Sequence, residues 1–329
     1  MRSDKTLQGV LCAAAGAACW GFSATCGQLL LGVHGVPFAW TVCLRLAMAA
    51  VTFLLVCLVA KRDELFRVVR QPRELARVAV FALCGMLFSQ VAFLACIGRT
   101  NAGTTTVLER CGLVLVMLIV CAQARRLPHI REIAGVALAI GGTVLVATKG
   151  DLGTLAIPAD GLLWGVCAAC ALVCYTMLPV GLLTRWSSLT VTALASCIAA
   201  AVANVAVQPW NIPVELTPQI AAAVLAMGVI GTFCSYLLFL RGVALAGPMR
   251  AGMVGCIEPV SAMAISALWL GTPVTPADAL GCAMIVGMVL LVTQREERPA
   301  AVSAETAAAA EDLSAGCRYS VEDGASPGR

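Results

Sequence analysis

The residues most able to do chemistry in this sequence are charged side chains inside long apolar stretches. Glu258 and Pro259 lie near the middle of the apolar run Gly247–Gly271. A carboxylate at such a depth in a membrane costs about 3 kcal/mol unless it is paired, protonated or facing water. Pro259 has no N–H and would break one turn of a helix. The pattern predicts a helix that lines a substrate path, with a structural kink around a locally bonded Glu as the alternative.

Three further charges recur at one depth in two other apolar runs. Arg45 lies in Phe38–Ala60, and Glu109 and Arg110 lie in Gly103–Gln123. At 1.5 Å per residue all three are about 10 Å from the same predicted boundary. We therefore expect Arg45 and Glu109 to contact each other, with Arg110 turned away or reaching outward. A network that binds a substrate carboxylate or amine and a closed structural ion pair both fit this arrangement.

Several uncharged polar or amphipathic side chains also lie within the apolar runs. Transport pockets are mostly apolar with a few placed polar groups, which makes these residues further candidates for substrate contact. They are Trp20, Ser23, Gln90, Tyr175, Ser235 and Tyr236.

Metal and cofactor chemistry has little support in the sequence. Cys167, Cys170 and Cys174 share one face of a predicted helix, but no His or acid joins them. His34 and His129 lie in different predicted loops. We interpret the cysteines as packing residues and expect no metal site and no cofactor.

Composition gives the class of protein. Hydrophobic residues make up 60% of the 329 residues, charged residues make up 12%, and the mean hydropathy is +0.92. Water-soluble domains carry about 25% charged residues, so this is an all-α polytopic membrane protein. Ten spans are predicted, near Leu7–Leu31, Phe38–Ala60, Leu75–Ile97, Gly103–Gln123, Ile130–Thr148, Asp160–Leu182, Ser188–Gln208, Gln219–Leu240, Pro248–Leu270 and Ala277–Thr293.

The basic residues alternate between the predicted loops. Lys and Arg concentrate after the second, fourth, sixth and tenth spans and around the turn between the eighth and ninth, and the intervening loops hold only Arg99 and Lys149. The positive-inside rule then predicts a multi-pass protein of the cell membrane with both termini cytoplasmic. Because the positive charge belongs to these loops, no nucleic-acid partner is expected.

The two halves of the chain resemble each other. The fifth span, from Gly135, and the tenth, from Gly281, share a pattern of Gly and aliphatic residues, and Gly98–Gly103 resembles Gly242–Gly247. Five spans per repeat invert the second half relative to the first, which is how many secondary transporters are built. The predicted units are a cytoplasmic N-terminus at 1–6, repeats at 7–149 and 158–294, and a disordered cytoplasmic tail at 295–329.

The ordered motifs resemble the drug/metabolite transporter superfamily, specifically its ten-helix branch with two EamA repeats. The resemblance covers about residues 7–294. It departs from the family at Thr272, where an acidic residue is common, and Glu109-Arg110-Cys111-Gly112 stands where the first half lacks a Glu-Pro pair. The motifs are Trp20-Gly21-Phe22-Ser23, Leu44-Arg45-Leu46, Gly228-Val-Ile-Gly-Thr, Leu245-Ala-Gly, Ile257-Glu258-Pro259-Val260 and Leu270-Gly271-Thr-Pro-Val-Thr-Pro276.

The resemblance implies secondary transport of a small organic metabolite, such as an amino acid, a related metabolite or a drug-like amphiphile. Export is the commoner direction in the family. No Walker-type sequence occurs, so protons or a substrate gradient are the expected energy source. The expected partners are the lipid bilayer and a small-molecule substrate, and a homodimer is left open. A membrane enzyme would need a catalytic constellation, and none is evident. A regulatory or scaffold subunit without transport is the other alternative.

Overall fold

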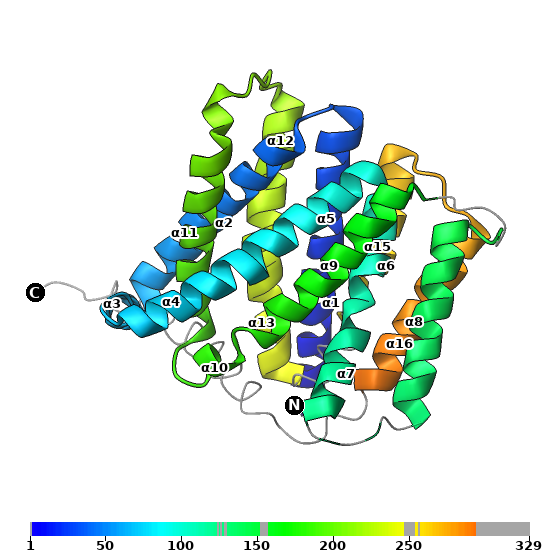
Figure 1. Cartoon of the computed structure of the whole chain (residues 1–329), viewed down its shortest axis with the longest axis horizontal. Helices are drawn as coiled ribbons and strands as arrows, with labels where there is room; N and C mark the ends of the chain where they lie inside the picture. The colour runs from blue at the N-terminus through cyan, green and yellow to red at the C-terminus, as the bar shows by residue number, and fades with distance from the viewer. Residues whose placement is uncertain are drawn as a thin grey trace, which may run out of the picture.

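All regular secondary structure in the described residues is helical. The computed structural model describes residues 2–123, 125, 127, 130–151, 157–246, 254–255 and 257–293, and these residues contain no strand (Figure 1). The first half comprises α1 (Arg2–Gln28), η1 (Leu29–Val33), α2 (Phe38–Ala60), α3 (Arg62–Val69), α4 (Pro72–Val80), η2 (Phe81–Leu87), α5 (Phe88–Arg99), α6 (Ala102–Arg110), α7 (Gly112–Gln123) and α8 (Ile130–Thr148). The second half comprises α9 (Ala159–Met177), α10 (Val180–Leu183), α11 (Ser188–Val207), η3 (Pro209–Asn211), α12 (Pro218–Gly228), η4 (Val229–Cys234), α13 (Ser235–Ala246), α15 (Ile257–Leu270) and α16 (Pro276–Thr293).

Seven helical segments of the described chain are long and apolar enough to cross a membrane. They are Thr6–Val33, Phe38–Ala60, Pro72–Arg99, Ala102–Gln123, Ala159–Leu183, Ser188–Asn211 and Pro218–Phe239. Three shorter apolar helices, Ile133–Val146, Ile257–Leu270 and Pro276–Met288, overlap the other three predicted spans. The predicted tail at 295–329 lies outside the described residues.

The structure corrects the sequence interpretation at three places. An amphipathic helix, α3, replaces the loop expected after the second span. The fourth span is interrupted at Cys111, between α6 and α7. Pro259 lies in the first turn of α15, which begins at Ile257. The first four N–H groups of a helix have no partner within it, so Pro259 removes no hydrogen bond from this helix.

Helices from the two halves pack against each other in pairs. The main contacts join α1 to α13 and α15, α2 to α11, α5 to α9, α6 to α15, and α8 to α16. Glycines allow the closest approaches: a Cβ at Gly142 of α8 would lie 2.8 Å from the Gly281 carbonyl oxygen, and a Cβ at Gly281 would lie 2.8 Å from that of Gly142. Such small residues let membrane helices come into backbone contact.

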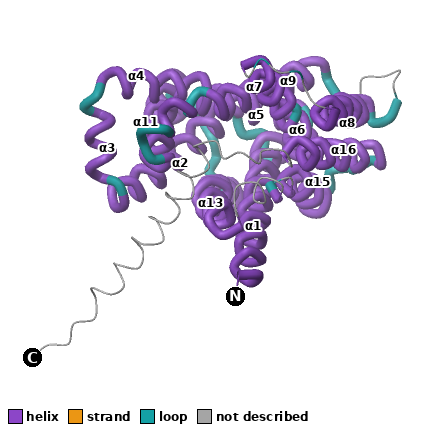
Figure 2. Tube along the Cα trace, turned by 90° about the horizontal axis from the view of Figure 1, so that it is seen from below, coloured by secondary structure: helices purple, strands orange, loops and turns teal. Residues whose placement is uncertain are grey.

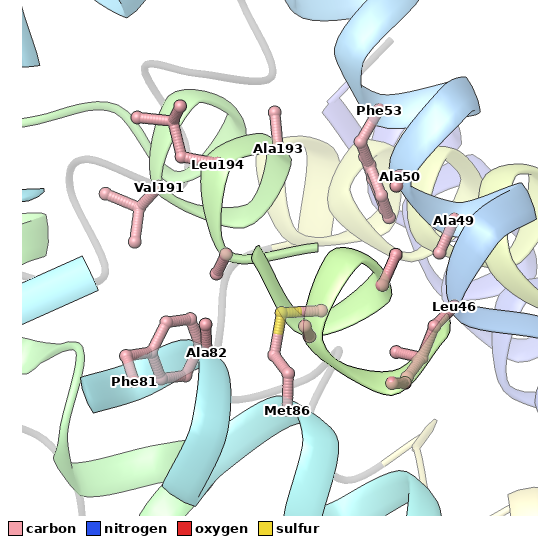
Figure 3. Close-up of a cluster of buried hydrophobic side chains, with 14 of the residues drawn as sticks. Leu46, Ala49, Ala50, Phe53, Phe81, Ala82, Met86, Val191, Ala193 and Leu194 are labelled. Atoms are coloured by element: carbon pink, nitrogen blue, oxygen red, sulfur yellow. The ribbon is translucent and has the colours of Figure 1, made fainter. Parts of the chain in front are cut away.

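The largest apolar core lies between α2, η2 and α11. Figure 3 shows Leu46, Ala49, Ala50 and Phe53 of α2 facing the residues of the other two elements. Those are Phe81, Ala82 and Met86 of η2 with Val191, Ala193 and Leu194 of α11. Two hydrogen bonds add to the α2–α11 contact: Cys43 Sγ donates to the Ala203 oxygen and Asn204 Nδ2 donates to the Cys43 oxygen, each at 3.4 Å.

Two long segments contain a π-helix near their middle. In the third predicted span η2 joins α4 to α5, and in the eighth η4 joins α12 to α13. Both segments begin with Pro at the first helical position, at Pro72 and Pro218. π-Helical turns are rare and are frequently found at functional sites. The two halves therefore share an unusual local feature at matching places.

Candidate functional site

A buried ion pair joins the two halves of the chain. Arg110, the last residue of α6, donates through NH2 to Glu258 Oε2 in the first turn of α15. The side chains are 20% and 9% exposed, respectively. A cation at the C-terminal end of a helix and an anion at an N-terminal end are both favoured by the helix dipoles. The helix breaks at Cys111 and before Ile257 therefore help to hold both charges in the apolar interior.

Glu258 also lines a small polar cavity between the halves. Its volume is about 80 Å³, enough for a few water-sized groups. The lining residues come from α1, α2, α5, α6 and α15, and they are Trp20, Arg45, Ser89, Gln90, Phe93, Glu109 and Glu258. Four helices of the first half and one of the second thus enclose one charged chamber.

Some polar atoms of this cavity have no hydrogen-bond partner. In Arg45 these are the buried Nε and NH1 atoms, and in Gln90 the buried Oε1 atom. The guanidinium carbon of Arg45 lies 5.8 Å from the centroid of the Phe93 ring, a cation–π contact. Buried polar groups are normally satisfied, so these atoms mark a place where a ligand or water could bind.

The expected direct contact between Arg45 and Glu109 stays a prediction. Both residues line the same cavity, as their equal depth predicts, and their opposite charges interact there. Arg110, expected to turn away, forms an ion pair with Glu258. The reason is the break at Cys111, which ends α6 at Arg110 beside the start of α15. Because the sequence predicts one continuous fourth span, this geometry could not be predicted from it.

Other predicted site residues lie away from the cavity. Ser235 is buried and donates to the Gly231 oxygen at 2.8 Å, inside its own helical segment. The Tyr236 hydroxyl lies 2.9 Å from Ser188 Oγ, and its ring packs on Phe53. Neither residue reaches the polar cavity.

Three more predicted residues also fall outside the cavity lining. The Tyr175 ring packs on Phe81 of η2 with centroids 5.6 Å apart. Pro259 is buried in α15. Ser23 is completely buried, its hydroxyl has no partner, and a Cβ on Gly231 would lie 2.2 Å from its Cβ and Oγ. We regard these residues as supports for the helices that carry the cavity.

Sequence reasoning missed three contributors to this region. Ser89 and Phe93 line the cavity from α5. Ser89 is next to Gln90 in the sequence and Phe93 is one helical turn after it, so both could have been predicted as neighbours of Gln90. Gln28 is the third: its Nε2 donates to Thr272 Oγ1 at 2.7 Å, and its Oε1 accepts from the Ala102 N–H at 2.9 Å. Gln28 thus joins the first half to the α15–α16 connection.

A larger apolar cavity makes a weaker candidate. It has a volume of about 300 Å³ and lies between α6, α7, α8 and α9. Its polar atoms are already bonded: Thr143 Oγ1 lies 2.8 Å from Cys111 Sγ and donates to the Ala139 oxygen. Within the described part of the chain no group of three potential metal ligands occurs. The charged chamber is therefore the candidate site, and its two carboxylates and the Arg45 guanidinium suit a small polar or charged solute.

Comparisons with known proteins agree with this architecture. The model of the EamA-like transporter family matches residues 7–148 and 159–294. An inner membrane transporter of Salmonella typhimurium, YicL, described as uncharacterized, is 26% identical over 295 residues, which is 90% of this chain and 98% of the relative. One solved crystal structure of a protein aligns with a TM-score of 0.59 and 17% identity, covering 91% of this chain and all of the other, and this likeness concerns the fold alone. The chain belongs to the EamA-like transporter family and is a membrane transporter.

Proposed function

We propose that the protein is a secondary transporter that moves a small organic metabolite, in the direction of export, by alternating access through the polar cavity. The observation that carries the proposal is the charged chamber between the halves, with its unsatisfied Arg45 and Gln90 atoms beside the Arg110–Glu258 pair. Charges in an apolar bundle are costly, and they mark substrate and ion paths in membrane proteins. Membership of a transporter family agrees with this interpretation.

An inverted repeat of five spans in each half is the second part of the proposal. It is supported by the matching π-helices η2 and η4. Equivalent contacts in the two halves also support it: an element of the first half contacts the second half in the same way as its counterpart in the second half contacts the first. A Cβ on Gly231 of η4 would meet Ser23 of α1, and a Cβ on Gly85 of η2 would lie 3.5 Å from Cα of Tyr175 in α9. Likewise α1 packs on α13, and α9 packs on α5.

Interrupted helices at the chamber support alternating access. α6 ends at Arg110, and α15 begins at Ile257, both beside the polar cavity. Transporters of this general architecture bind substrate at helix interruptions near the midplane, between repeats that rock against each other. In our proposal the Arg110–Glu258 pair is one contact that must loosen when the halves move. Glu258 is the candidate carrier of a coupling proton.

A metabolite screen tests the proposed function. Intracellular and medium pools are compared between cells with the protein, cells without it, and cells with Glu258→Gln at equal protein level. We expect one small polar metabolite to accumulate in the medium with the wild type and to be reduced toward the protein-free level with Glu258→Gln. Identical pools in all three cell lines would argue against transport.

A further inference from the structure

We propose that exposed arginines on the α3–α4 hairpin form a binding surface for the headgroups of anionic phospholipids. The arginine surface consists of Arg62, Arg67, Arg70 and Arg73, all exposed. Arg62, Arg67 and Arg70 lie between Ala60, where the apolar helix α2 ends, and Pro72, where the next apolar segment begins, and Arg73 directly follows Pro72. Both neighbouring segments are long enough to cross a membrane, so α3 lies at headgroup depth.

The acidic residues of the hairpin are turned toward the body of the protein. Glu64 Oε1 accepts from the Ser187 N–H at 2.5 Å. Buried Glu74 accepts from Arg77 and Arg185 at 3.0 Å and from Trp186 Nε1 at 3.3 Å. These contacts attach the hairpin to the connection before α11. Both carboxylates, those of Glu64 and Glu74, are engaged in them. Asp63 is the only exposed acid in residues 61–77.

Apolar side chains share the exposed side of α3 with the arginines. Leu65 and Val68 are buried against the protein, whereas Phe66 and Val69 are 45% and 44% exposed. The Arg62 guanidinium lies 5.9 Å from the Phe66 ring centroid. Figure 2 shows α3 at the edge of the bundle, next to α4. Basic and aromatic residues together are typical of helices that lie in the membrane interface. A lipid headgroup, with its glycerol and acyl region beneath, matches both features, and an acidic soluble partner matches only the charge.

Lipid titration of the full-length protein in neutral detergent tests this surface without any assumption about transport. The probes are phosphatidylglycerol and phosphatidylcholine of equal chain length, and the readouts are bound lipid and the melting temperature. We expect tighter binding of phosphatidylglycerol, weakened by salt. Arg67→Gln/Arg70→Gln/Arg73→Gln should lower that affinity on the order of a hundredfold, since each basic residue near an anionic surface contributes about fivefold.

A matched control removes the same net charge elsewhere. Arg99→Gln/Arg125→Gln/Lys149→Gln changes three exposed basic residues that are remote from α3 in the sequence, and it should bind phosphatidylglycerol within about twofold of the wild type. Equal loss in both triple variants, an unchanged affinity in the first, or equal binding of the two lipids would overturn the proposal. Tighter binding of an acidic peptide than of phosphatidylglycerol would also overturn it, because the surface would then be a protein-docking site.

Discussion

Removing either member of the Arg110–Glu258 pair takes a counter-ion away from a charge in the apolar interior. We expect Arg110→Leu and Glu258→Leu each to destabilise the protein by about 3 kcal/mol, near the lower limit for desolvated pairs because Arg110 is 20% exposed. The double variant should recover much of this loss, since no charge is then left without its partner. Thermal unfolding of the purified variants measures the effect. Additive losses in the double variant would show that the two residues do not stabilise each other.

Arg45 should contribute less to stability than Arg110, because two of its three guanidinium nitrogens are buried without a hydrogen-bond partner, whereas Arg110 donates to Glu258. Nε and NH1 are buried and unsatisfied, so Arg45→Met removes a costly desolvation together with the contact to Phe93. We expect Arg45→Met to lower the melting temperature less than Arg110→Met does, while transport is lost. The comparison uses the same substitution at two arginines that differ in their partners. A larger loss of stability at Arg45 would mean that its charge is satisfied in the folded protein.

At the scale of the helices, tight packing of α1 on α13 should be sensitive to a single methyl group. A Cβ at Gly16 would lie 2.8 Å from the Phe239 nitrogen and from the Ser235 oxygen, both backbone atoms that cannot move alone. Gly16→Ala should therefore cost about 1–3 kcal/mol through overpacking. Gly32→Ala is the control, because a Cβ there meets nothing within 4 Å. Chemical or thermal unfolding of the two variants should separate them clearly, and equal stability would contradict the close contact of α1 with α13.

Much of the helical order can be predicted from apolar run length and turn residues. The second and fifth predicted spans match the structure at both ends, as α2 (Phe38–Ala60) and α8 (Ile130–Thr148). The helix break at Cys111 could not be predicted, because Cys and Gly within an apolar run are compatible with a continuous span. The π-helix η2 likewise has no local sequence signal, since it depends on packing against α9 and α11.

The candidate site could be predicted in part for the same reason. Equal depth along straight helices correctly brings Arg45 and Glu109 to one cavity. It cannot tell which arginine faces which carboxylate, because the helix break and the start of α15 decide that. Tyr236 shows the converse error: a polar group within a span can be satisfied by one neighbour, here Ser188, and take no part in the cavity.

For the whole molecule, the distribution of basic residues predicts the orientation in the membrane. Figure 1 places α3, the end of α7 and α10 toward the same end of the bundle as the N-terminus. Arg62–Arg77, Arg125 and Arg185 lie in or beside these elements. We expect reporter fusions after Arg77 and Arg131 to read cytoplasmic and fusions near Gly35 and Pro213 to read external. A cytoplasmic signal at Gly35 together with an external signal at Arg77 would reverse the topology.

Transport through the chamber is the central claim, and blocking the chamber tests it most directly. Ser89 lines the cavity of about 80 Å³, while Cys84 is exposed in the same apolar segment. The measurement is counterflow in proteoliposomes of the metabolite that the screen identifies, with wild type, Ser89→Phe and Cys84→Phe at equal amounts of folded protein. We expect Ser89→Phe to reduce the rate by at least about tenfold, because the ring fills the chamber, and Cys84→Phe to stay close to wild type. Counterflow by Ser89→Phe at the wild-type rate would contradict a substrate path through this cavity.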